Sequence, residues 1–277
     1  MRHTRTLVAA TTVALALGAV SACSAAKQAA EGAAAPLVSV ADAMSLATTK
    51  TDGYSSVKVT AQISSGGSGQ MSMSGRIGWK PFAMDVSVQS PKLAQLGSGT
   101  MREMFSGSTM YLNMGADAAA KMGGKHWMKM DLSTLGPSGK SFSDMINQSG
   151  GQDPATQLKL LTTSKGIKRV GTETVNGVKA THYQGTVNVS DLPANASGGL
   201  KNLLESAQKE GLTSETVDAW VGADNLPVRI STSAATNAGT FSSTVDYSDY
   251  SASSVTVTPP AASDTLDFGQ LLKGLKS

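Results

Sequence analysis

The chain has 277 residues, of which 40% are hydrophobic and 16% are charged, and its formal net charge is +3 at pH 7. The first 22 residues contain two arginines, Arg2 and Arg5, and no acidic residue. The remaining 255 residues contain 21 basic and 20 acidic residues, and charges of one sign do not cluster in the sequence. Such a nearly neutral chain is a poor candidate for binding nucleic acid or an acidic substrate. A single cysteine also excludes an intrachain disulfide, so the core alone must stabilise the fold.

The first 22 residues have the pattern of a secretory signal peptide. A mostly apolar run from Leu7 to Val20 is about the length of a secretory h-region and too short to span a bilayer. It ends in Val20-Ser21-Ala22-Cys23, the pattern of a lipobox, in which the Cys23 thiolate takes a diacylglyceryl group. Two acyl chains, such as palmitate, anchor a protein stably where one does not. We therefore predict that residues 1–22 are removed and that Cys23 anchors the chain on the extracytoplasmic face of the cell membrane; the alternative is an unlipidated signal peptide with a chance cysteine.

The lipidated cysteine is followed by a flexible, Ala-rich tether, so that residues 23–37 link the anchor to the domain. Pro36 ends this segment, and residues 38–277 are long enough for one large domain. An amphipathic helix is predicted over 38–50, with Ser39 at its N-cap and Asp42 in its first turn.

Most of the remaining chain alternates apolar and polar residues, which predicts antiparallel strands with one buried face. The predicted strands, in chain order, are 57–63, 71–77, 82–89, 100–105, 109–114, 126–131, 167–175, 178–189, 215–221, 227–235, 239–247 and 253–258. Asn176-Gly177 predicts a type I′ hairpin turn between two of them, and Pro259-Pro260 is expected to end the sheet.

Several segments have helical spacing instead. The predicted helices are 116–122, 141–163, 196–210 and a short helix or frayed end over 266–275. Within the second, Asp153-Pro154 has the pattern of an N-cap followed by proline at the first helical position.

Three ordered stretches of the domain carry a family resemblance. They read Tyr111-Leu112 with Trp127 and Lys129-Met130; Val175-Asn176-Gly177-Val178-Lys179-Ala180-Thr181-His182-Tyr183 running into Gly185-Thr186-Val187; and Ala219-Trp220-Val221 with Leu226-Pro227-Val228-Arg229, completed by Tyr247-Ser248-Asp249-Tyr250. Together with the lipobox, the set resembles the LppX/LprG-type lipoproteins of actinobacterial cell envelopes over about residues 38–258. The resemblance implies an α+β fold: a strongly curved antiparallel sheet, a half-open barrel similar to that of the carriers LolA and LolB, with helices covering its concave face. It also implies binding or transport of acylated lipids and glycolipids in an apolar cavity, without catalysis.

The residues themselves place one set of apolar side chains on a common face. Eight of them share the same parity on adjacent predicted strands, so they should line one concave face beneath the helices of 141–163 and 196–210. They are Val57, Val59, Met71, Met73, Met84, Val86, Met110 and Leu112. Unbranched methionine adapts to variable ligand shapes. The residues alone favour a loosely specified core over a cavity, and the family resemblance reverses that preference.

Catalytic and metal-binding patterns are missing from the sequence. His126 and His182 are too far apart in sequence for a local metal site, and each is expected at the sheet surface. Ser55-Ser56-Val57-Lys58 matches an S-x-x-K motif but falls on an alternating strand, and no K-T-G follows. Thr134 to Ser141 only approximates a P-loop, and Trp127 and Trp220 are expected to anchor the sheet. We expect no enzyme activity, no cofactor and no metal.

Two functional hypotheses remain from the sequence. The first is a membrane-tethered carrier or binder of a lipid or other hydrophobic ligand. The second is an interaction or sensor-accessory lipoprotein, with a closed, ligand-free core, that binds another envelope protein through its outer surface. A deep pocket would favour the first, and a filled core with an exposed apolar patch would favour the second.

Overall fold

The computed structural model describes residues 39–66, 69–96, 99–113, 115–136, 139–140, 153–164, 166–191 and 211–274. Residues 40–277 form one compact unit. The predicted signal peptide, Cys23 and the tether lie outside the described residues, as do 141–152 and 192–210, where the predicted covering helices begin or lie.

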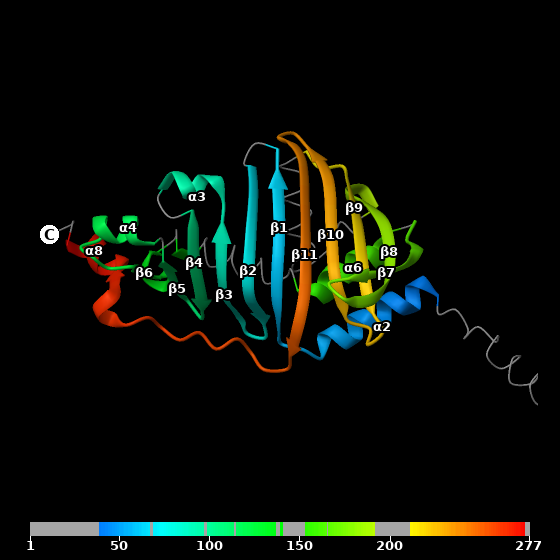
Figure 1. Cartoon of the computed structure of the whole chain (residues 1–277), viewed down its shortest axis with the longest axis horizontal. Coiled ribbons are helices and arrows are strands. Elements are labelled where there is room, and N and C mark those ends of the chain that lie inside the picture. The colour runs from blue at the N-terminus through cyan, green and yellow to red at the C-terminus, as the bar shows by residue number, and fades with distance from the viewer. Residues whose placement is uncertain are drawn as a thin grey trace, which may run out of the picture. The chain divides into compact units, whose positions relative to one another are not determined.

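A single open sheet of twelve strands makes up most of the domain (Figure 1). The strands are β1 (Ser56–Ser65), β2 (Gly69–Trp79), β3 (Phe82–Gln89), β4 (Thr100–Ser106), β5 (Thr109–Asn113), β6 (Trp127–Asp131), β7 (Lys168–Val175), β8 (Val178–Asn188), β9 (Ser214–Gly222), β10 (Pro227–Thr236), β11 (Gly239–Ser251) and β12 (Thr265–Asp267). Their order in the sheet is β12-β6-β5-β4-β3-β2-β1-β11-β10-β9-β8-β7. Neighbours that follow one another in sequence pair antiparallel, which confirms the predicted meander and the α+β class.

The strand register places the alternating apolar residues on one face, which we call the inner face. Val59 pairs with Gly75 and with Tyr247, and Met84 pairs with both Ile77 and Phe105. Directly paired residues of antiparallel strands point to the same side, so the inner face is continuous across β1–β6 and β8–β11. The opposite, polar side is the outer face.

Two helices pack on the inner face over β8–β10. They are α2 (Val40–Asp52) and α6 (Pro154–Thr163), drawn beside the yellow and green strands in Figure 1. Their apolar side chains join those of the sheet in one cluster: Met44, Ala47, Leu158, Leu161, Tyr183, Val187, Val217, Ala219, Val221 and Ile230. The alignment of these apolar stripes with the sheet explains why both helices form there.

Local sequence signals position α6. The Asp153 side chain accepts a hydrogen bond from the Thr156 backbone N–H at 2.8 Å, and Pro154 occupies the first turn, as predicted. At the other end, the Ser164 hydroxyl donates to the Thr186 carbonyl at 2.9 Å. Gly185 allows this close approach, since a Cβ there would lie 2.8 Å from Ser164 Oγ.

Two further glycines meet backbone requirements. Asn176 and Gly177 both have positive φ, 49° and 82°, and Val175 pairs directly with Val178. This confirms the predicted turn with positive φ at both residues. Within β2, Gly75 has φ 152°, and a Cβ there would lie 2.2 Å from the Asp85 carbonyl oxygen; only glycine fits this position.

The C-terminal part differs from the prediction. Residues 253–258 form no strand, although Val255 is buried against Gly78. After Pro259-Pro260 the chain adds β12, which pairs parallel with β6, so these prolines do not end the sheet. The final helix α8 (Phe268–Gly274) lies within the predicted tail, and α4 (Ala116–Lys121) matches its prediction. The short helix α3 (Pro91–Leu96) was not predicted.

Candidate ligand-binding cavity

A cavity of about 340 Å³ opens on the inner face beside α6. It is lined by side chains of β1, β2, β3, β9, β10 and β11 and by the first turns of α6. The apolar lining consists of Val57, Val59, Met73, Ile77, Trp79, Phe82, Met84, Pro154, Ile230, Phe241, Val245 and Tyr247, and the polar lining of Asp153, Gln157, Glu215, Thr232 and Ser243. Its volume lies at the low end of the roughly 300–1,000 Å³ found for small-molecule sites.

The eight residues predicted for the cavity share the inner face but divide between two environments. Four of them line the cavity: Val57, Val59, Met73 and Met84. Val86 is buried without lining it, and Met71 is half-buried on the same face. Met110 and Leu112 instead belong to a packed cluster around Phe105 and Leu132. The structure therefore brings four of the eight together in the cavity, and their contact with a ligand stays a prediction.

The apolar part of the lining contains a polar atom without a partner. Trp79 lines the cavity, and its indole N–H is buried with no acceptor among the described residues. A buried N–H without an acceptor is uncommon in folded proteins, because the lost hydrogen bond is not replaced.

Carboxyl groups lie at the polar part of the cavity and farther along the inner face. Glu215 lines the cavity from β9, and burial raises its pKa, against the opposing effect of a hydrogen bond from Thr232. Burial likewise raises the pKa of Glu103, which the register places between Val86 and Leu112. Sequence reasoning missed both, although each interrupts an alternating apolar pattern at an inward position.

On the outer face, by contrast, two arginines form ion pairs with aspartates of neighbouring strands. Arg102 forms a bidentate ion pair with Asp85, at 2.9 and 2.8 Å. Arg229 does the same with Asp246, at 2.6 and 2.9 Å, and lies over the Trp220 ring. These pairs straddle neighbouring strands, which is the usual placement of stabilising charge on a sheet.

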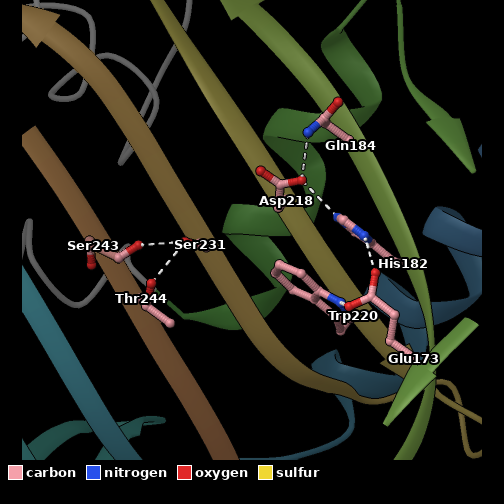
Figure 2. Close-up of polar contacts among 8 residues, drawn as sticks. All are labelled: Glu173, His182, Gln184, Asp218, Trp220, Ser231, Ser243 and Thr244. Carbon is pink, nitrogen blue, oxygen red and sulfur yellow. Dashed lines mark hydrogen bonds and ion pairs between the residues drawn. The ribbon is translucent and has the colours of Figure 1, made fainter. Parts of the chain in front are cut away.

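Figure 2 shows a polar cluster of this outer face, on β7, β8 and β9. The ring nitrogens of His182 lie 2.8 Å from Glu173 Oε1 and 2.7 Å from Asp218 Oδ1. The Trp220 ring stacks on His182 at 4.2 Å, and its indole N–H donates to Glu173 at 2.9 Å. The hydrogen bond from Trp220, followed by that from His182, lowers the pKa of Glu173.

This cluster corrects the expectation for His182. It lies on a strand, but it is only 8% exposed and is covered by Trp220 instead of standing at the surface. Both ring nitrogens face carboxylates, so neither is free to take a proton from a nucleophile. The Ser231 hydroxyl group, also drawn in Figure 2, forms a hydrogen bond with Thr244 Oγ1 at 2.8 Å and does not contact His182.

The described residues contain neither a metal-binding cluster nor a membrane-spanning helix. In that part of the chain, no group of His, Cys, Asp and Glu side chains is arranged to hold a metal ion. None of the helices described there is both long and apolar enough to cross a membrane.

Comparison with known proteins places the chain in a family. No family model matches it. A protein of Streptomyces griseus, described as an uncharacterized 31.2 kDa protein in the rplA-rplJ intergenic region, is 37% identical over 240 residues, which cover 81% of this chain and 77% of that protein. The chain belongs to the family of this streptomycete protein. A second relative, named "Putative lipoprotein SCO4650", from Streptomyces coelicolor, is 32% identical over 65% of this chain, but the match spans only 55% of that protein's length.

The fold of this family member is that of LppX. The crystal structure of the lipoprotein LppX from Mycobacterium tuberculosis matches with a TM-score of 0.50 and 17% identity, over 79% of this chain and 97% of that one. This confirms the resemblance to LppX/LprG-type lipoproteins and the curved, open antiparallel sheet. At 17% identity the similarity establishes the fold, while the ligand must be argued from the cavity of this chain.

Proposed function

We propose that this protein is a lipoprotein of the cell envelope, held at the extracytoplasmic face of the membrane by acyl chains on Cys23, and that its cavity binds a lipid or other hydrophobic ligand without catalysis. The observation that carries the proposal is the inner-face cavity, whose lining is mostly apolar but includes a few polar groups. That composition is typical of sites for small hydrophobic molecules.

Three further observations support binding over the closed-core alternative. Met73 and Met84 give the lining flexible side chains that adapt to different ligand shapes. The buried Trp79 indole N–H has no acceptor among the described residues, and a ligand oxygen that reached it would accept its hydrogen bond. The similarity to LppX and the lipoprotein name of the second relative agree with an envelope carrier. An envelope protein partner, or transfer of ligand to one, remains part of the hypothesis.

The direct test is to identify bound lipid. The full chain is purified from membranes, and organic extracts are analysed by mass spectrometry against extracts of a mock purification. We expect one lipid class in amounts approaching the amount of protein. Extracts without any enriched lipid, from protein that is folded by circular dichroism, would contradict the proposal.

The anchor is tested separately, because it lies outside the folded domain. Cys23→Ser should move the protein from the membrane fraction to the soluble fraction or to unprocessed precursor, with its melting temperature unchanged. Fractionation followed by immunoblotting measures this. A cleaved Cys23→Ser protein that stayed in the membrane would overturn the lipid-anchor assignment.

A further inference from the structure

The charged residues of the described cavity lining have a single sign. Among the described residues that line the cavity, Glu215 carries a carboxyl group and no lysine or arginine is present. Glu103 lies farther along the inner face, between Val86 and Leu112. Asp153 adds a third carboxylate at the rim, where its two oxygens already accept from Thr156 N and Oγ1 at 2.8 and 2.9 Å. Arg102 and Arg229 lie on the outer face, and Lys179, which has inward parity, is exposed beside the β7–β8 turn and does not line the cavity.

This distribution matters because two of the three carboxyl groups line the cavity. Glu215 and Asp153 both line it, together with the amide of Gln157. A phosphate or carboxylate of a ligand placed there would face like charges in a partly buried site, where water screens them weakly. Hydroxyl groups, in contrast, would donate hydrogen bonds to these same oxygens, and bonds to ionised acceptors are among the strong ones.

From this we infer that the cavity selects by head-group charge: it takes an acylated ligand whose head is uncharged and bears hydroxyl groups, and it rejects anionic lipids of the same chain length. The acyl chain lies between Val57, Ile77 and Met84, and the head faces Asp153, Gln157 and Glu215. This inference rests on the proposed function, since it assumes that the cavity holds a ligand.

The test uses two photoreactive probes with the same acyl chain, a monoacylglycerol and its phosphate, a lysophosphatidic acid. The mature, lipidated protein is reconstituted in phosphatidylcholine vesicles, each probe is added at the same mole fraction, and the labelled peptides are quantified by mass spectrometry after irradiation. We expect the neutral probe to label cavity peptides about tenfold or more above the anionic probe, in line with the repulsion of like charges at low screening.

Variants assign the preference to the carboxylates. Glu215→Gln should raise labelling by the anionic probe several-fold, whereas Asp117→Asn, which removes one exposed negative charge on α4, should not. If Glu215→Gln fails to fold, Asp153→Asn serves instead, because asparagine also caps a helix.

The outcomes separate the two claims. Cavity labelling that is equal for both probes, stronger for the anionic one, or unaltered in the glutamine and asparagine cavity variants overturns charge selection while leaving lipid binding intact. Labelling by neither probe at any cavity peptide overturns both the inference and the proposed function.

Discussion

The inner face has two regions built from the same alternating sequence pattern, but one is packed as a core and the other borders a cavity. Over β8–β10 it is filled: Leu158 and Leu161 of α6 and Val217 of β9 are all fully buried where the helices meet the sheet. Over β1–β3 and β11 the same face borders a cavity, and Met73 and Met84 remain half-buried. The difference arises from what lies above the sheet, since the strands of both regions present apolar side chains in the same register. An apolar face is thus a necessary condition for either a core or a binding site, and packing decides between them.

The largest expected effect comes from truncating the filled region. Leu158→Ala removes a fully buried side chain between α6 and the sheet, so it should lower the free energy of unfolding by about 2 to 5 kcal/mol. Met84→Ala, at the cavity, should cost on the order of 1 kcal/mol, because the side chain borders the cavity and is only partly buried. Denaturant unfolding of both variants measures the contrast. Equal losses would mean that the cavity region is packed as tightly as the core.

Replacing a valine by the larger tryptophan should also affect the two regions differently. Val217→Trp forces an indole into the filled region and should destabilise the fold by about 1 to 3 kcal/mol. Val59→Trp places the same group beside the cavity, where it should occupy empty space and abolish lipid co-purification with little loss of stability. Melting temperature and bound lipid are measured on the same samples. A marked destabilisation by Val59→Trp, with no lipid on the unmodified protein, would defeat the carrier hypothesis.

The smallest expected effect concerns pH and compares the two faces. Burial raises the pKa of Glu215 above that of the unfolded chain, so its protonated form favours the fold and stability is lost as pH rises through the raised value. Hydrogen bonds from Trp220 and His182 lower the pKa of Glu173, so its contribution is present above the unfolded pKa and lost as pH falls through the lowered value. Melting temperatures between about pH 3 and 8 test both signs.

Two glutamine variants separate these contributions. The stability of Glu215→Gln relative to the unmodified protein should increase as the pH rises. Glu173→Gln should be less stable than the unmodified protein at neutral pH, and this difference in stability should shrink as the pH falls. Parallel curves for all three proteins would contradict the contrast between the faces.

The sequence was most informative where structure follows from local periodicity. The alternation in 57–63 and 71–77 predicted strands whose paired residues share a face, and Asn176-Gly177 predicted the turn that joins β7 to β8. Asp153 was recognised as an N-cap because the capping requirement is local. These features depend on neighbours within a few residues, so one sequence suffices to predict them.

Features that depend on distant partners were missed or wrong. Val255 alternates like a strand residue, but it packs against Gly78 without a hydrogen-bonded neighbour strand. The three residues of β12 are too few for a pattern, and they pair with β6 with the help of the Lys129–Asp267 ion pair at 3.1 Å. The burial of His182 likewise depends on the Trp220 ring, 38 positions later in the chain.

Only half of the predicted cavity residues line the cavity, because its position also depends on distant parts of the chain. Parity put Val57, Met73, Met110 and Leu112 on one face, but parity cannot tell which of them border empty space. That depends on where α6 begins and on the size of side chains such as Phe105. Periodic patterns report the direction of a side chain and not the volume above it.

The pairing of β1 with β11 has a consequence for how the protein assembles. This seam joins residues about 190 positions apart, such as Val59 and Tyr247, whereas the neighbouring pairs on either side connect strands that are close in sequence. Local pairings form faster than distant ones, because closing a long loop costs more entropy. The two meanders, β1–β5 and β7–β11, are therefore expected to form first and to join last. Because strands of both meanders line the cavity, the cavity exists only after the two meanders have joined. A molecule bound there would therefore stabilise the pairing of β1 with β11.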